Sequence, residues 1–182
     1  MNNKVYKKLM NIYEHSKLTK LYSDMRKRKG KLAMFKGDMN PDILFIGEAP
    51  DKEEDSWGIP FIGRSGQLID KWIEYFKLDS FAFINAVPIC PMDSLGKLRK
   101  PTKNELDYFR PKMYELIDLL NPRVIVLLGR SAEELVLGKT TLKVGNYTNF
   151  KGYKCIFVYH PAYYLRNGTD GINELKETFT SI

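Results

Sequence analysis

Residues 43–55 read "ILFIGEAPDKEED", and this stretch predicts the central feature of the fold. Four apolar residues lead into Gly47, after which the sequence changes to Glu48, Ala49, Pro50 and further acids. A short apolar run that ends at a glycine is typical of a strand buried on both faces. The acids therefore directly follow a core strand, although the chain as a whole is basic.

Three further apolar runs predict strands: "FAFINAVP" at residues 81–88, "RVIVLLG" at residues 123–129 and "KCIFVY" at residues 154–159. The last of these is expected to run into a loop at "HPAYYL". Helical spacing predicts helices at about residues 3–29, 65–78, 103–120 and 130–137, and a helical C-terminal segment. Ser65 is the expected N-terminal cap of its helix, and Pro111 predicts a break or a second helix start.

Strands that alternate with helices predict an α/β fold with three layers, in which a short, mostly parallel sheet lies between helices. The chain contains no internal repeat, low-complexity tract or linker. We therefore expect a single domain over residues 1–182, with a basic helical segment at about residues 1–30.

The composition is that of a globular protein with excess positive charge. Apolar residues make up 43% of the chain and charged residues 28%, which argues against disorder. The net charge is +7, and the basic residues concentrate within residues 1–38 and 97–103. This pattern favours either a polyanionic partner or solvated basic faces. Residues 26–31 are the candidate outer contact with such a partner.

The sequence also limits the location and the chemistry of the protein. It has no apolar run long enough to cross a bilayer and no signal-peptide core, so we expect a cytoplasmic protein without a membrane partner. Cys90 and Cys155 are too few for a disulfide framework or a metal site and are expected to be buried thiols. Motifs for dinucleotide, triphosphate or zinc binding do not occur.

In a parallel α/β sheet, ligands bind beyond the carboxyl ends of the strands. Glu48, Asn85 and His160 each follow or end a predicted strand. Each has a structural alternative: a helix cap, a turn and a core histidine. Together, an acid, an amide and an imidazole suit the reading of a base and the breaking of a bond. Phe61 in "GIPFIGRSG" could stack on such a base, and the small residues around it would let a backbone approach phosphate.

Five motifs occur in order: "GEAP" at residues 47–50, "GIPFIGRSG" at 58–66, an Asn that ends a strand, "PRVIVLLGRSA" at 122–132 and "HPAYYLRN" at 160–167. Over about residues 30–170 the chain thereby resembles the uracil-DNA glycosylase superfamily, most closely its family-four type. The resemblance implies a monofunctional DNA repair enzyme with the three-layer fold of that superfamily. It would flip uracil out of DNA and hydrolyse the N-glycosidic bond with water, leaving an abasic site.

The resemblance also implies a role for each residue of the pocket. Glu48 and His160 would be catalytic: Glu48 near the sugar and the attacking water, His160 as a hydrogen-bond donor to uracil O2. Phe61 would stack on the flipped base, and Asn85 would pair with its polar edge. Ala49 would also contact uracil.

The implied partner is DNA that contains uracil, in double- or single-stranded form, bound by a monomer. The enzyme would act in the cytoplasm at the nucleoid or, if a virus encodes it, in the host cytoplasm. Two groups would contact DNA: Arg64, Ser65 and Gly66 at the phosphates, and Tyr163, Tyr164, Leu165 and Arg166 in a loop that enters the duplex.

The chain departs from the family-four pattern in three respects. Members of that family carry an iron–sulfur cluster on four cysteines, whereas Cys90 lies about one residue from the third ligand position and Phe109 stands at the fourth. We therefore expect no cofactor and no metal, with hydrophobic packing in place of the cluster. Asp51 replaces a family glycine, and "VPICPMD" replaces a Lys-Cys-Arg-Pro-Pro segment. These changes leave two alternatives open: a weak or inactive DNA-binding or replication accessory protein, and a glycosylase for another damaged or modified base.

Overall fold

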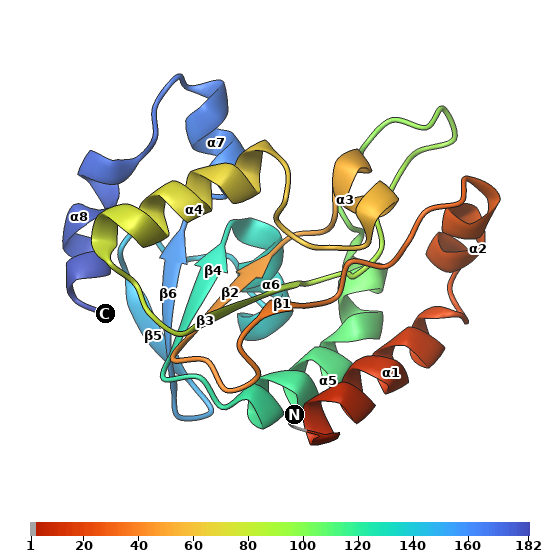
Figure 1. Cartoon of the computed structure of the whole chain (residues 1–182), viewed down its shortest axis with the longest axis horizontal. Helices are drawn as coiled ribbons and strands as arrows, with labels where there is room; N and C mark the ends of the chain where they lie inside the picture. The colour runs from red at the N-terminus through yellow and green to blue at the C-terminus, as the bar shows by residue number, and fades with distance from the viewer. Residues whose placement is uncertain (1–2) are drawn as a thin grey trace.

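The computed structural model describes residues 3–182, which form one sheet with the strand order β1-β3-β2-β4-β6-β5 (Figure 1). The strands are β1 (Lys36–Gly37), β2 (Ile43–Gly47), β3 (Phe81–Asn85), β4 (Val124–Leu128), β5 (Tyr147–Phe150) and β6 (Tyr153–Val158). The inner strands β3, β2, β4 and β6 run parallel, and β1 and β5 pair antiparallel at the edges. The prediction of a mostly parallel sheet is confirmed. Sequence reasoning missed both edge strands because they are short and lack an apolar run.

Helices cover both faces of this sheet, which confirms the three layers. They are α1 (Asn3–Ser16), α2 (Lys20–Lys27), α3 (Lys52–Trp57), α4 (Arg64–Phe76), α5 (Lys103–Leu120), α6 (Arg130–Leu137), α7 (Pro161–Arg166) and α8 (Ile172–Thr180). Alternate residues of β2 point to opposite layers: Leu44 and Ile46 pack with α1, α2, α5 and α6, whereas Ile43 and Phe45 pack with α4, α7 and α8 (Figure 1). None of the helices within residues 3–182 is long and apolar enough to span a membrane.

Two predictions of helix boundaries were wrong. The N-cap of α4 is Gly63 rather than Ser65, so the helix begins at Arg64. Helix α5 is continuous through Pro111, after a capping box formed by Thr102 and Glu105. Pro111 lies on the exposed side of the helix, where water can satisfy the carbonyl that the proline leaves unpaired.

The acidic stretch after Glu48 forms the helix α3, which was not among the helices predicted from the sequence. Asp51 is the N-cap of α3: its Oδ1 accepts from the backbone N–H of Glu54 at 2.9 Å, and Glu54 Oε2 accepts from the N–H of Asp51 at 2.9 Å. The residue that departs from the family glycine therefore starts a helix. The expected loop at "HPAYYL" is likewise the short helix α7, with Pro161 in its first turn.

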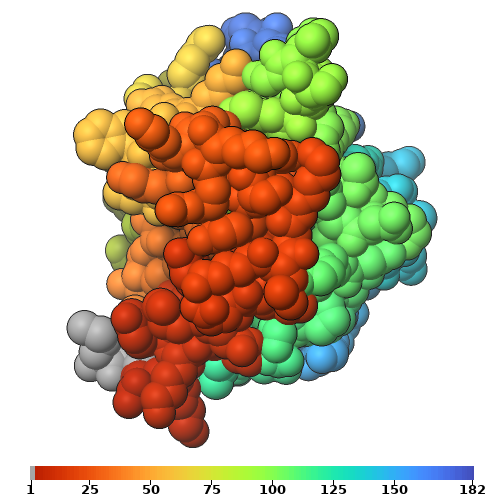
Figure 2. All heavy atoms as spheres, turned by 90° about the vertical axis from the view of Figure 1, so that its right-hand side faces the viewer, coloured from red at the N-terminus to blue at the C-terminus, as the bar shows by residue number. Residues whose placement is uncertain are grey.

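The N-terminal segment is anchored to the rest of the molecule by Arg28. Its guanidinium donates two hydrogen bonds to Asp55, at 3.0 and 2.7 Å, and a third to the backbone oxygen of Cys90 at 3.0 Å. Figure 2 shows the N-terminal residues, in red and orange, spread over the side of the molecule that faces right in Figure 1. Within residues 26–31, the candidate outer contact with DNA, the charge of Arg28 is already paired with Asp55. The DNA contact of this segment stays a prediction.

Candidate active site

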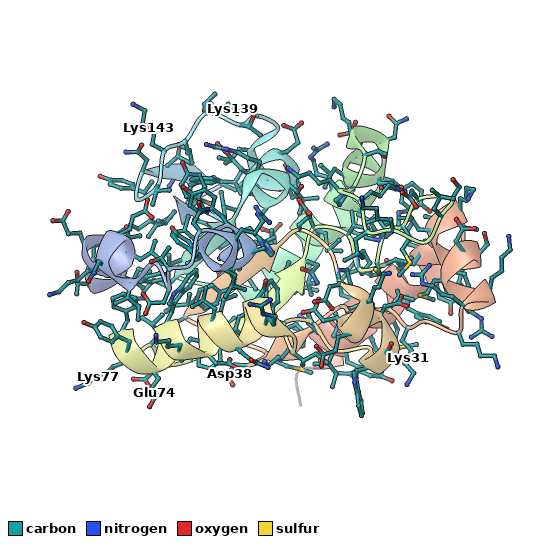
Figure 3. All side chains as sticks on the ribbon, turned by 90° about the horizontal axis from the view of Figure 1, so that it is seen from above. Lys31, Asp38, Glu74, Lys77, Lys139 and Lys143 are labelled. Atoms are coloured by element: carbon teal, nitrogen blue, oxygen red, sulfur yellow. The ribbon has the colours of Figure 1, made fainter. Side chains whose placement is uncertain are left out.

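A cavity of about 440 Å³ lies at the carboxyl ends of the parallel strands. Glu48, Phe61, Asn85 and His160 all line it. Figure 3 looks down on this face of the molecule. The parallel order of the sheet explains the convergence, because residues at the carboxyl ends of β2, β3 and β6 are far apart in sequence but reach the same edge.

Gly47, the last residue of β2, lies between two of these side chains. A Cβ atom placed there would lie 2.3 Å from Cζ of Phe61 and 2.8 Å from Oδ1 of Asn85. Only a residue without a side chain therefore lets the ring and the amide approach each other at this strand end. The result is a slot with an aromatic face beside a polar edge.

Phe61 adopts a strained backbone conformation, with φ at +55° and only 3% of its surface exposed. Nζ of Lys36 donates to its carbonyl oxygen at 3.1 Å, and a Cβ at Gly66 would lie 2.0 Å from that oxygen. The ring packs against Phe83 with a centroid distance of 5.3 Å. Such strain persists only where surrounding contacts maintain it, and it is found most often at functional sites. Gly66 therefore supports the backbone of Phe61.

Asn85 is buried, with 2% of its surface exposed, and its Nδ2 has no hydrogen-bond partner among residues 3–182. An unpaired buried donor costs roughly 1–3 kcal/mol of stability. A ligand that accepts a hydrogen bond in the cavity would remove this cost.

His160 is fixed as a neutral imidazole with a defined tautomer. Its Nδ1 accepts from the backbone N–H of Ala162 at 3.2 Å, so the ring proton resides on Nε2. Burial, together with the positive charges of Arg166 and Lys100, lowers the pKa of His160 to about 4. His160 can therefore present an N–H donor across the physiological pH range.

Glu48 is half-buried and accepts a 2.6 Å hydrogen bond from the hydroxyl of Ser131 on Oε2. Ser131 belongs to the first turn of α6, so the carboxylate is tied to the neighbouring strand–helix connection. Sequence reasoning gave no site role to Ser131, and it counted Lys36 only among the basic residues of the N-terminal part. A signal for Ser131 was its position after β4, at the edge where Glu48 also emerges.

A second carboxylate, that of Glu54, also lines the cavity. Burial raises its pKa to about 7, although the backbone N–H groups of Asp51 and Ile62 donate to it at 2.9 and 3.3 Å. Its two oxygens join the start of α3 to the loop that carries Phe61.

Comparison with known proteins identifies the family of this chain. The family model described as Uracil DNA glycosylase superfamily matches residues 34–181. The chain belongs to the uracil-DNA glycosylase superfamily. Among its relatives is the Type-4 uracil-DNA glycosylase of Thermotoga maritima, with 31% identity over 77% of this chain and 73% of the relative. The Type-4 enzymes of Sulfurisphaera tokodaii and Archaeoglobus fulgidus are each 28% identical, over 77% and 76% of this chain and 71% and 74% of those proteins.

Ala49, which was expected to contact uracil, lines the cavity. The residues of this superfamily member that were expected to contact DNA are divided between the cavity rim, the surface and the interior. Ser65, Tyr163 and Arg166 line the cavity, Arg64 is exposed at the start of α4, and Gly66 is buried against the backbone of Phe61. The DNA-contact prediction was wrong for Tyr164, which is fully buried and meets Trp72 edge-on at 5.6 Å between ring centroids. Leu165 is half-buried and packs against the same core as Trp72. This leaves Tyr163 and Arg166 as the accessible side chains of α7.

The residues at the expected cluster positions do not fit an iron–sulfur cluster. Phe109 is fully buried in the hydrophobic core with Leu21 and Ile89. Burial raises the pKa of the Cys90 thiol to about 12, which disfavours the thiolate that a metal requires. Residues 3–182 contain no group of three or more His, Cys, Asp or Glu side chains that could bind a metal ion.

Proposed function

We propose that this superfamily member removes uracil from DNA by hydrolysing the N-glycosidic bond, leaving an abasic site. The single observation that carries the proposal is the buried, unpaired amide of Asn85 beside the Phe61 ring. The superfamily membership and the Type-4 relatives support it.

A flipped uracil would fill the slot with its ring on Phe61 and its polar edge on Asn85. The amide Nδ2 would donate to O4, and Oδ1 would accept from N3–H. Cytosine carries an amino group in place of O4 and an unprotonated N3, so it would present the opposite pattern. Taking the base out of the duplex costs a few kcal/mol, which stacking and hydrogen bonds in the slot would offset.

Cleavage of the bond between C1′ and N1 leaves positive charge on the sugar and negative charge on the departing base. Nε2–H of His160 would donate to uracil O2, where the negative charge collects, and the Glu48 carboxylate would stabilise the sugar cation and orient water. The water oxygen then bonds to C1′ and loses a proton, while uracil leaves with the electron pair and is protonated at nitrogen. No lysine nucleophile is required, so we propose a monofunctional enzyme.

The proposed partner is uracil-containing DNA, bound by a monomer in the cytoplasm, where the DNA is accessible. Ser65 and Arg64 at the start of α4 would contact phosphates, and Tyr163 and Arg166 on α7 would contact the duplex beside the flipped nucleotide. The overall net charge of +7 favours this partner.

Single-turnover excision on labelled oligonucleotides tests the proposal. Uracil, hypoxanthine and hydroxymethyluracil are compared in single and double strands, with alkaline cleavage to reveal abasic sites. We expect release of uracil, and strand breakage only after alkali. Breakage without alkali would contradict the monofunctional mechanism. Preference for another base, or tight DNA binding without release of any base, would replace the proposal with one of the two alternatives that Asp51 and the segment around Cys90 leave open.

A further inference from the structure

Residues 91–100, between β3 and α5, form an ordered hairpin beside the cavity. Its arms meet at a bridge between Met92 and Leu98, and the backbone N–H of Asp93 donates to the oxygen of Lys97 at 2.9 Å. The Asp93 side chain organises the tip, because its Oδ1 accepts from the N–H groups of Leu95 and Lys97, each at 2.9 Å. The conformation of the hairpin is therefore determined by its own hydrogen bonds.

The base of the hairpin is fixed to the start of α5. The guanidinium of Arg99 donates to both oxygens of Glu105, at 3.0 and 2.7 Å, and to the backbone oxygen of Lys100 at 3.0 Å. Glu105 is also part of the capping box that starts α5. These hydrogen bonds fix the base of the hairpin relative to α5.

The hairpin stands across the cavity from α7. Pro91, Leu98, Arg99 and Lys100 line one wall of the cavity, and Tyr163 and Arg166 also line it. Figure 1 shows the hairpin and α7 on opposite sides of the carboxyl ends of the strands, and Figure 2 shows the light-green segment rising at the upper edge of the molecule. A duplex whose nucleotide enters the cavity would meet both projections.

The tip of the hairpin presents an apolar side chain among basic ones. Leu95 is 91% exposed, and Lys97 near the tip and Lys100 at the base of the hairpin are exposed as well. A single exposed leucine is ordinary on a protein surface. Leu95 differs because an ordered turn projects it from a hairpin whose base, with Arg99 and Lys100, lines the cavity where DNA is the proposed substrate. Apolar side chains in such positions can enter the gap between base pairs of deformed DNA.

We propose that residues 91–100 are a second DNA-contacting element, which places Leu95 against the bases next to the flipped nucleotide and Lys97 and Lys100 on the phosphates. This inference rests on the proposed function. The partner is duplex DNA, because the positive charges of Lys97 and Lys100 match its phosphates and the apolar side chain of Leu95 matches its stacked bases.

Anisotropy measurements of binding to a duplex with a stable abasic-site analogue test the proposal without turnover. Leu95→Ala should weaken duplex binding roughly tenfold and leave single-strand binding unchanged, as the loss of one inserted side chain would do. Leu18→Ala is the matched control, because Leu18 is 81% exposed on the connection between α1 and α2. The double variant K97A/K100A should reduce the salt dependence of log K by about 1.8, or about 0.9 per phosphate contact. Lys139 lies at the periphery of the molecule in Figure 3, and Lys139→Ala should leave the salt dependence of log K unchanged.

The outcomes separate this inference from the proposed function. If wild type releases no base but Leu95→Ala still weakens duplex binding selectively, the hairpin stands and the glycosylase proposal fails. If wild type excises uracil and Leu95→Ala binds duplex as wild type does, the hairpin inference is overturned. Equal losses on duplex and single strand would also overturn it, because an inserted side chain needs paired flanking bases. Circular dichroism of each variant verifies the fold.

Discussion

The hydroxyl of Ser131 donates a 2.6 Å hydrogen bond to a carboxylate oxygen of Glu48, across 83 positions of sequence. The bond joins the residue that follows β2 to the helix that follows β4, which is the neighbouring parallel strand. It restricts the rotamers of a half-buried carboxylate whose proposed task is to face the sugar and a water molecule. Ser131 is therefore a positioning residue for Glu48.

Ser131→Ala should lower the single-turnover rate of uracil excision about 10- to 100-fold, because a hydrogen bond to a charged group contributes about 1.5–3 kcal/mol. Affinity for uracil-containing DNA should change little, since Ser131 does not contact the base in the proposed arrangement. Ser131→Thr keeps the hydroxyl and should restore most of the rate. Equal rates for wild type and Ser131→Ala would show that Glu48 needs no such partner.

Asn85→Asp replaces the unpaired Nδ2 donor with a carboxylate oxygen. Uracil excision should fall severely, because O4 would then face an acceptor, and weak action on cytosine could appear since its N4 amino group suits a carboxylate. Excision from matched oligonucleotides with uracil or cytosine measures both effects. Binding to undamaged DNA should be retained. A variant that remains fully active on uracil would place the base elsewhere in the cavity.

His160→Ala should slow uracil release about a hundred- to a thousandfold, as removal of one preorganised donor to a developing anion does. In wild type the rate should show no titration of His160 between pH 8 and about 5, because its pKa is lowered to about 4. An excision rate that changes with an apparent pKa near 6.5, and loses that change in His160→Ala, would contradict the buried neutral imidazole.

The same pKa shift has a consequence for stability. The folded state lowers the pKa of His160 to about 4 by burial, so between about 6.5 and 4 the unfolded chain binds more protons than the folded one. The contribution of His160 to the free energy of unfolding is therefore complete above pH 6.5 and is lost as the pH falls towards 4. Glu54 acts in the opposite direction, because burial raises its pKa to about 7. Urea unfolding measures this effect. The free energy of unfolding at pH 5 minus that at pH 7 should be more negative for wild type than for His160→Ala, because Glu54 contributes equally in both proteins.

Lys36 donates to the carbonyl of Phe61 at 3.1 Å, and its Nζ also lies 5.2 Å from the centre of the Phe83 ring. Lys36→Met removes the donor that maintains the positive φ of Phe61. We expect a higher KM for uracil-containing DNA, with a smaller change in kcat and unchanged affinity for undamaged DNA. Lys139→Met is the control, because Lys139 lies at the periphery (Figure 3). A general loss of DNA affinity in Lys36→Met would instead make Lys36 a phosphate contact.

The purified protein should be colourless and contain no iron, and chelators should leave its melting temperature unchanged, because a metal stabilises only a state that binds it. Metal analysis measures the iron content. Stoichiometric iron with the absorption of a cluster would contradict the poor fit of Cys90 and Phe109.

Arg28→Met should lower stability by roughly 1–3 kcal/mol, because it leaves the buried Asp55 carboxylate without its partner. Thermal unfolding of the variant and of wild type measures this effect.

The sequence by itself determined the parallel strands and the convergence of Glu48, Asn85 and His160. Each of the four parallel strands was recognisable from a local apolar run. The rule that parallel strands share a carboxyl edge placed the residues at their ends close together. The motifs "GEAP" and "HPAYYLRN" could be read from the sequence as well, because each is a contiguous stretch, and they indicated the superfamily. The roles assigned to these residues remain predictions for the experiments above.

Only the tertiary structure decided which side chains support the site and which are accessible. Tyr163 and Tyr164 are adjacent and chemically alike, but consecutive side chains on a helix point about 100° apart, so one faces the cavity and the other faces Trp72. The contacts of Ser131 with Glu48 and of Lys36 with Phe61 join residues from different strands and loops. Such contacts depend on strand order and on a positive φ at a phenylalanine, and neither has a local signature in the chain.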